Sequence, residues 1–183
     1  KLTEPGLRAD KENALKEFLL RLGTPCDQFD KVRFYCQTAA VLIRAGWEKE
    51  ALEFFKTSLE AIEALPDGAK GHLAFQSVNH IIDELKESAR IEETRGLIDQ
   101  SFAGMNTYLK KGDYYRFTLL TGFVPLFARS GQYDQAVSCL EEAVDIWKKF
   151  INPQKEMADL LVAWQALAGI PGAEKSTRRI LEV

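Results

Sequence analysis

The sequence lacks several features that point to particular classes of partner. Its net charge is −3, with 24 Lys and Arg against 27 Asp and Glu, so the basic excess of a general nucleic-acid binder is missing. No apolar run reaches the roughly 18 residues that a membrane-spanning helix needs, and the first residues do not form the apolar segment of a signal peptide. We therefore predict a cytoplasmic protein that binds no nucleic acid and does not insert into a membrane.

Cysteine is also scarce. The three cysteines, Cys26, Cys36 and Cys139, are odd in number and form no CxxC pair, so neither zinc nor redox chemistry is indicated. Cys36 and Cys139 lie in apolar-patterned segments, where free cysteine behaves as a small buried hydrophobe. This usage is consistent with a reducing compartment.

Catalytic and cofactor motifs are missing as well. The sequence contains no GxGxxG, GxxxxGK[ST] or GxSxG pattern. Its two histidines, His72 and His80, lie eight residues apart, and although His80 precedes Asp83 and Glu84, a metal site needs three or four converging ligands. We predict no catalytic residues, no cofactor and no metal, and an all-α enzyme is the least favoured hypothesis.

What the sequence does contain is helical periodicity throughout. Between residues 133 and 147 the apolar side chains follow one face of a helix, and no alternating run indicates a strand. The pattern predicts an all-α protein with nine helices, near 5–22, 25–45, 47–65, 69–88, 91–110, 112–130, 132–150, 153–169 and 172–183. Short connections predict antiparallel packing of successive helices.

Helix boundaries carry recognisable signals. Thr24 followed by Pro25 predicts a helix start, as does Asn152 followed by Pro153. Gly112 and Asp113 separate two further helices. We expect residues 1–183 to form a single domain, and because Lys1 rather than Met begins the chain, we expect a piece of a longer protein.

The turns between paired helices, here called elbows, recur at a nearly constant interval. They lie at Gly46, Ala89, Gly131 and Gly172, which gives spacings of 43, 42 and 41 residues. Each elbow is followed at +5 by a small residue or threonine and at +9 by a larger apolar one: Ala51 and Phe55, Thr94 and Ile98, Ala136 and Leu140, Thr177 and Leu181. A small side chain at +5 lets the second helix approach the first, and the +9 side chain fills the space between them. Such a period predicts an α-α superhelix, a solenoid of antiparallel helical hairpins.

One elbow carries a family resemblance. Gly131-Gln132-Tyr133-Asp134-Gln135-Ala136 resembles the helix-to-helix turn of tetratricopeptide repeats, and Ala143 matches a further small position of that motif. The turn from Gly46 to Ala51 is a looser match, and the layout extends over residues 25–183. The usual repeat of that family is about 34 residues. The longer period implies a variant such as the repeats of kinesin light chain-like proteins, and HEAT-like or other helical-hairpin arrays stay open.

The resemblance implies a concave groove lined by the first helix of each hairpin, which often holds a peptide or a helix. Projected from the elbows, the candidate partner-binding residues are Arg33, Arg44, Gln76, Asn79, Asp83, Thr118, Thr121 and Arg129. Cys36, Ala40, Glu87 and Pro125 fall on the same projected face. A polar stripe at helical spacing is also what any solvated helix face shows.

An irregular feature is the stretch LLTGFVPLFARS, residues 119–130, in which Gly122 and Pro125 interrupt an apolar helix. Pro125 should bend this helix and release the carbonyl of Thr121. The bend either serves packing alone or deforms the groove wall, so that the carbonyl faces a ligand.

These patterns favour a protein–protein interaction scaffold that binds a partner peptide or helix in the groove. The alternative is a regulatory or sensor module of a larger signalling or transcription-regulating protein, binding a small ligand or another domain of its own chain. The sequence of the full-length protein would separate the two.

Overall fold

A computed structural model describes residues 13, 17, 27–149, 154–168 and 170. In these ranges the secondary structure is entirely helical, which confirms the all-α prediction. The long helices are α2 (Gln28–Ala45), α3 (Glu48–Glu63), α4 (Asp67–Glu87), α5 (Arg95–Tyr108), α6 (Tyr114–Arg129), α7 (Tyr133–Trp147) and α8 (Gln154–Leu167). The predicted helix at 172–183, the Gly172 elbow and most of the helix at 5–22 lie outside the described residues.

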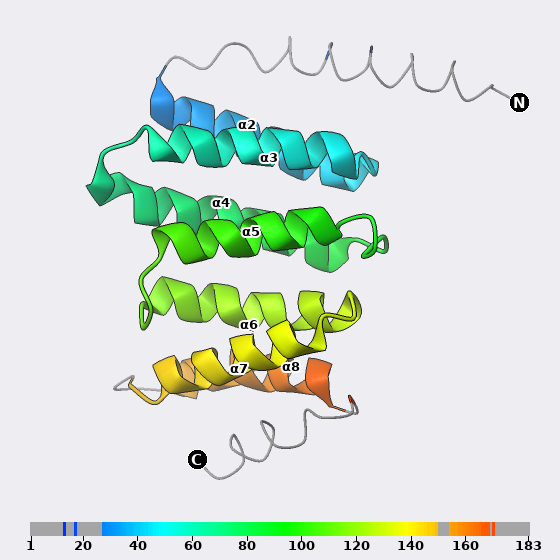
Figure 1. Cartoon of the computed structure of the whole chain (residues 1–183), viewed down its shortest axis with the longest axis vertical. Helices are drawn as coiled ribbons and strands as arrows, with labels where there is room; N and C mark the ends of the chain where they lie inside the picture. Colours follow the sequence, from blue (N-terminus) through cyan, green and yellow to red (C-terminus); the bar gives the residue numbers. More distant parts are fainter. Residues whose placement is uncertain (1–12, 14–16, 18–26, 150–153, 169, 171–183) are drawn as a thin grey trace, which may run out of the picture.

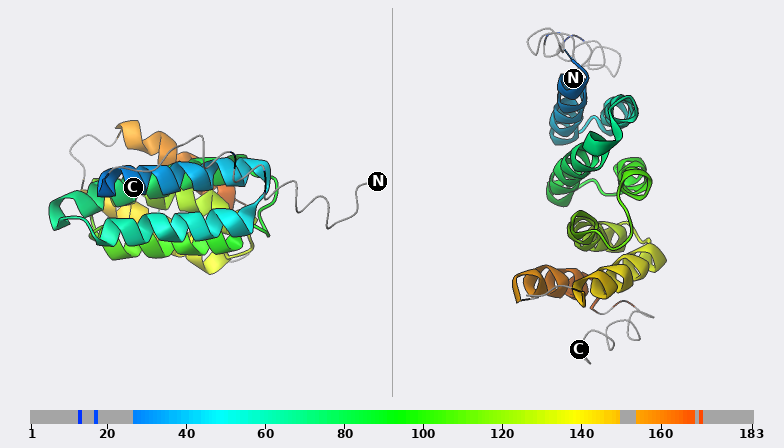
Figure 2. Two further views of the ribbon diagram at one scale, coloured as in Figure 1. Left: turned by 90° about the horizontal axis from the view of Figure 1, so that it is seen from above. Right: turned by 90° about the vertical axis from the view of Figure 1, so that its left-hand side faces the viewer.

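The helices form successive hairpins, α2–α3, α4–α5 and α6–α7, with α8 packed against the last. Helix α2 packs on α4, α4 on α6 and α6 on α8, so the first helices of the hairpins form one layer. Helix α3 packs on α5 in a second layer, and Figure 2 shows the two layers side by side. Each hairpin therefore packs mainly against its neighbours in the sequence.

Both described glycine elbows have the same geometry. Gly46 and Gly131 adopt positive φ values of 74° and 73°. The residue after each glycine donates a backbone hydrogen bond across the turn, from Trp47 N to Leu42 O at 2.9 Å and from Gln132 N to Phe127 O at 2.8 Å. Since only glycine adopts this conformation readily, the two elbows end their helices in the same way.

The elbow at Ala89 differs, and the predicted start of its second helix at residue 91 is wrong. Helix α4 ends at Glu87, Ser88 is extended, and α5 begins only at Arg95. Without glycine the chain cannot turn at once through the left-handed conformation, so it uses a longer connection. The repeat offsets still hold, because Thr94 and Ile98 are fully buried.

The offset positions of the glycine elbows are buried as well. Ala51, Phe55, Ala136 and Leu140 have no exposed surface, and all four lie in the continuous core. The small +5 residues therefore sit where the paired helices approach, as the spacing predicts.

The start of α2 also differs from its prediction. The helix begins at Gln28, and the Asp27 side chain accepts a hydrogen bond from Asp30 N at 2.8 Å. Asp27 is thus the cap rather than a helical residue. The predicted caps and first helical residues at Thr24 and Pro25 and at Asn152 and Pro153 lie outside the described residues, as does Cys26. Asp113 caps α6 through Tyr115 N at 3.0 Å, which agrees with the predicted boundary.

A buried arginine joins the second and third hairpins. Arg116 on α6 donates to both carboxylate oxygens of Glu142 on α7, at 2.5 and 3.1 Å. It also donates to Asn106 Oδ1 at 2.7 Å and to Leu109 O at 3.4 Å, near the end of α5. Its side chain is 4 % exposed and that of Glu142 is 28 % exposed, so the guanidinium is buried while the carboxylate reaches the edge of the core.

Helix α6 continues through the irregular stretch to Arg129, with Pro125 inside it. Thr121 is 8 % exposed, and its hydroxyl donates to Thr118 O at 2.9 Å. Gly122 lies against α4, where an added Cβ would come within 3.0 Å of Ile82 Cγ2. The glycine thus permits close packing of α4 and α6.

Candidate interaction surface

The layer formed by α2, α4, α6 and α8 carries the predicted partner-binding residues. On α2 both Arg33 and Arg44 are exposed, and on α4 so are Gln76 and Asp83, with Asn79 half-buried. The sequence pattern therefore located an exposed polar face on the first two of these helices.

The polar side chains of α4 form hydrogen bonds mostly with other side chains of the same helix. Gln76 Nε2 lies 2.9 Å from His72 Nε2, and Asn79 Nδ2 donates to Asp83 Oδ2 at 3.2 Å. Lys86 Nζ also donates to Asp83, at 3.3 Å. These exposed pairs contribute little to stability, so a partner can replace them at small cost.

Two of the predicted residues meet in a hollow between α2 and α4, with a volume of about 240 Å³. Its lining combines apolar side chains with polar ones: Val32, Arg33, Cys36, Gln37, Leu73, Gln76, Ser77 and His80. We call it the α2–α4 hollow. A lining that mixes apolar and polar side chains suits the anchoring of a partner side chain.

The thiol of Cys36, which lines this hollow, has low reactivity. Cys36 Sγ donates to Ser77 O at 3.5 Å, and burial raises the pKa of the thiol to about 12. Burial likewise raises the pKa of Cys139 to about 12. Both cysteines are free and buried, which confirms their prediction as small core residues.

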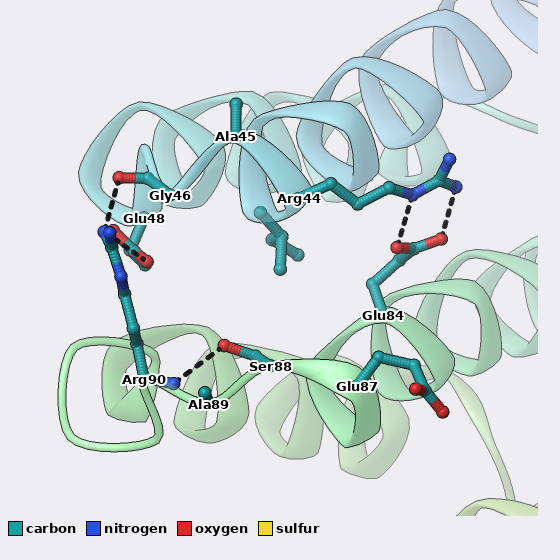
Figure 3. A pocket seen from close by; sticks show the side chains of 10 residues that line it. Arg44, Ala45, Gly46, Glu48, Glu84, Glu87, Ser88, Ala89 and Arg90 are labelled. Carbon is teal, nitrogen blue, oxygen red and sulfur yellow. Dashed lines mark hydrogen bonds and ion pairs between the residues drawn. The ribbon is translucent and has the colours of Figure 1, made fainter.

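A second hollow, of about 330 Å³, lies at the elbows of the first two hairpins. We call it the elbow cleft; it is lined by Ile43, Arg44, Ala45, Gly46, Glu48, Glu84, Glu87, Ser88, Ala89 and Arg90. Figure 3 shows two charged bridges flanking it, Arg44 with Glu84 on one side and Arg90 with Gly46 and Glu48 on the other.

The bridge between Arg44 and Glu84 is bidentate. Arg44 donates from Nε at 2.6 Å and from Nη2 at 2.5 Å to the two carboxylate oxygens. These hydrogen bonds lower the pKa of Glu84, and His80 acts in the same direction. The predicted residue Arg44 is therefore already engaged within the chain, linking α2 to α4.

The predicted residues of α6 lie apart from both hollows. Arg129 donates to Lys86 O at 2.9 Å and to Ser88 O at 2.5 Å, at the end of α4. Positive charge at a helix C-terminus is stabilising, so Arg129 caps the preceding hairpin. Thr118 donates to Tyr114 O at 3.5 Å and is half-buried.

The structure thus divides the predicted set. It brings Arg33 and Gln76 together, places Arg44 at the elbow cleft and gives Arg129 a capping contact. Glu48 and Arg90, which the sequence reasoning missed, also line the cleft. The repeat offered a signal for Arg90: a constant period sets successive elbows side by side, so a long residue beside one elbow can reach the one before it.

No metal site is evident in the described ranges, where no three His, Cys, Asp or Glu side chains are placed to hold an ion. Across the same residues, no helix combines the length and apolar character needed to cross a bilayer. No family model, curated protein or solved structure matches the chain.

Proposed function

We propose that this chain is a tetratricopeptide-like scaffold that binds a partner peptide or helix on the face formed by α2, α4 and α6. In this proposal about four hairpins form a right-handed superhelix with that face on its concave side. The identical glycine elbows and the packing of α2 on α4 and α4 on α6 support this arrangement.

The α2–α4 hollow carries the proposal. It combines apolar lining residues such as Val32 and Leu73 with the exposed Arg33 and Gln76, a composition suited to one apolar anchor held by polar contacts. Its position between the first helices of successive hairpins is where the predicted groove would lie.

A binding role rather than a catalytic one is also part of the proposal. The thiol of Cys36 has a pKa of about 12, so it is protonated at neutral pH. The carboxylate of Glu84 has a lowered pKa and is held by Arg44, which suits neither a general acid nor a nucleophile. We further propose a cytoplasmic location, which is supported by the free, buried thiols of Cys36 and Cys139.

The test is selection of binding peptides from a displayed library, followed by affinity measurement against variants of the full chain. The double variant Arg33→Ala/Gln76→Ala should weaken the selected peptides about tenfold or more. The matched control, Lys49→Ala/Glu60→Ala, removes two exposed side chains of α3 in the other layer and should leave affinity unchanged. Equal losses in both variants, or loss in the control alone, would refute binding at the hollow.

A further inference from the structure

The elbow cleft contains a buried carboxylate oxygen that accepts no hydrogen bond. Oε1 of Glu48 has no hydrogen-bond partner, and the side chain is 10 % exposed. The nearby cation, Arg90, places Nη1 3.7 Å from this oxygen, which is beyond hydrogen-bond range. The oxygen is buried from solvent, and leaving a buried charged acceptor without a hydrogen bond is unfavourable, so a donor that reaches it on binding would be stabilising.

Arg90 is held in a position from which it does not supply that donor. Its Nη1 donates to Gly46 O at 3.3 Å, across the elbow of the preceding hairpin. A Cβ added to Gly46 would lie 2.5 Å from the same nitrogen, so the guanidinium rests directly on the glycine. The guanidinium thus borders the cleft, and Figure 3 shows it beside the Glu48 carboxylate.

The charge around the cleft favours a cation as the occupant. Its lining has two arginines, Arg44 and Arg90, against three carboxylates, Glu48, Glu84 and Glu87. The C-terminal end of α2 also borders it, at Ala45, and a helix C-terminus carries partial negative charge, whereas the end of α4 is already capped by Arg129.

We infer that the elbow cleft binds the guanidinium or ammonium end of an arginine or lysine side chain from a protein partner, which donates to Glu48 Oε1. The cleft volume of about 330 Å³ has room for one such side chain. The inference depends on the proposed binding role only in naming a protein partner as the source of the cation. The small-molecule experiment below needs no partner, so the two proposals can fail separately.

The probes are Nα-acetyl-arginine amide and its neutral isostere Nα-acetyl-citrulline amide, titrated into the ¹⁵N-labelled full chain. We expect saturable NMR shifts of the Glu48, Ser88 and Ala89 amides with the arginine probe and at least tenfold weaker binding of the citrulline probe, since the charge-assisted hydrogen bond is lost. Equal binding of the two probes would overturn the cation site. Tighter binding of putrescine would assign the cleft to a free diamine and overturn the side-chain source.

Two variants locate the contact. Glu48→Gln keeps the shape of the side chain, removes its charge and should weaken the arginine probe about tenfold or more. Glu53→Gln, an exposed carboxylate of the same helix, is the matched control and should bind as the parent does. Ala45→Leu fills the cleft from the exposed end of α2 without changing Glu48, so it should also abolish binding. Unchanged binding by Ala45→Leu in a chain with the parent's melting temperature would overturn the proposed position.

Discussion

Replacing Arg116 by leucine removes the buried cation that joins α5, α6 and α7. The substitution leaves Glu142 without its bidentate partner, and Asn106 Oδ1 and Leu109 O without their donor. Removing one member of a buried pair typically costs about 3–5 kcal/mol. Because the Glu142 side chain is 28 % exposed and can recover solvent contact, we expect the lower end, about 3 kcal/mol.

The measurement is urea unfolding of the parent, both single variants and the double variant Arg116→Leu/Glu142→Leu. For a chain of this size, a loss of about 3 kcal/mol corresponds to a fall of about 6–12 °C in melting temperature. The double variant should be more stable than the sum of the single losses predicts, because it leaves no unpaired carboxylate. Arg33→Leu, at an exposed position, is the matched control and should change the stability by less than about 0.5 kcal/mol.

Additive losses in that cycle would refute the reasoning, since they would mean that Arg116 and Glu142 act independently. A loss below about 1 kcal/mol for Arg116→Leu would refute it too, because an exposed pair gives that value.

Three further predictions concern packing, pH and thiol chemistry. Gly122→Ala should destabilise the chain by about 1–3 kcal/mol, since the new Cβ would press on Ile82. The matched variant Gly68→Ala in α4 meets nothing within 4 Å and should stabilise the chain by about 0.5–1 kcal/mol. Equal effects of the two variants in thermal unfolding would contradict the close packing of α4 and α6. Arg44 lowers the pKa of Glu84 in the folded state. The stability that this ion pair contributes is therefore fully present above the pKa of Glu84 in the unfolded chain, and it is lost as the pH falls through the pKa of Glu84 in the folded chain. The urea midpoint should therefore fall more between pH 7 and about pH 3.5 for the parent than for Glu84→Gln, and an equal fall would remove this assignment. In the variant Cys26→Ser, Cys36 and Cys139 should react with Ellman's reagent at pH 8 only after unfolding, because burial raises the pKa of each thiol to about 12. Rapid reaction of the folded chain would contradict their burial.

The sequence predicted the regular parts of the fold because backbone chemistry determines them locally. Gly46 and Gly131 occupy left-handed positions that other residues adopt only with strain, so their spacing located two hairpins. The connection between α4 and α5, around Ala89, was predicted too short. Where glycine is missing from an elbow, the sequence does not indicate how many residues the chain needs to make the turn.

The candidate site was predicted less completely, because a constant period shows which helices lie side by side but not which partner each polar side chain chooses. A charged residue within an apolar helix pattern suggests an exposed position, yet Arg116 is buried by partners on two other helices. Arg129 lies at a projected groove position but bonds to the end of α4. By contrast, Arg33 and Gln76 were predicted to share a surface because the constant period aligned α2 with α4.

The contacts between elbows give the array a direction. Arg90 donates back to Gly46, Gln132 donates back to Asp99 at 2.9 Å, and Arg129 donates back to the end of α4, although Arg44 reaches forward to Glu84. A ribosome makes the receiving hairpin first, so its terminal carbonyls stay open to solvent until the donating hairpin has emerged. Shortening the chain from its C-terminal side therefore leaves the last remaining hairpin uncapped. Shortening it from the N-terminal side removes the acceptor Gly46 O, together with the forward-reaching donors Arg44 and Cys36.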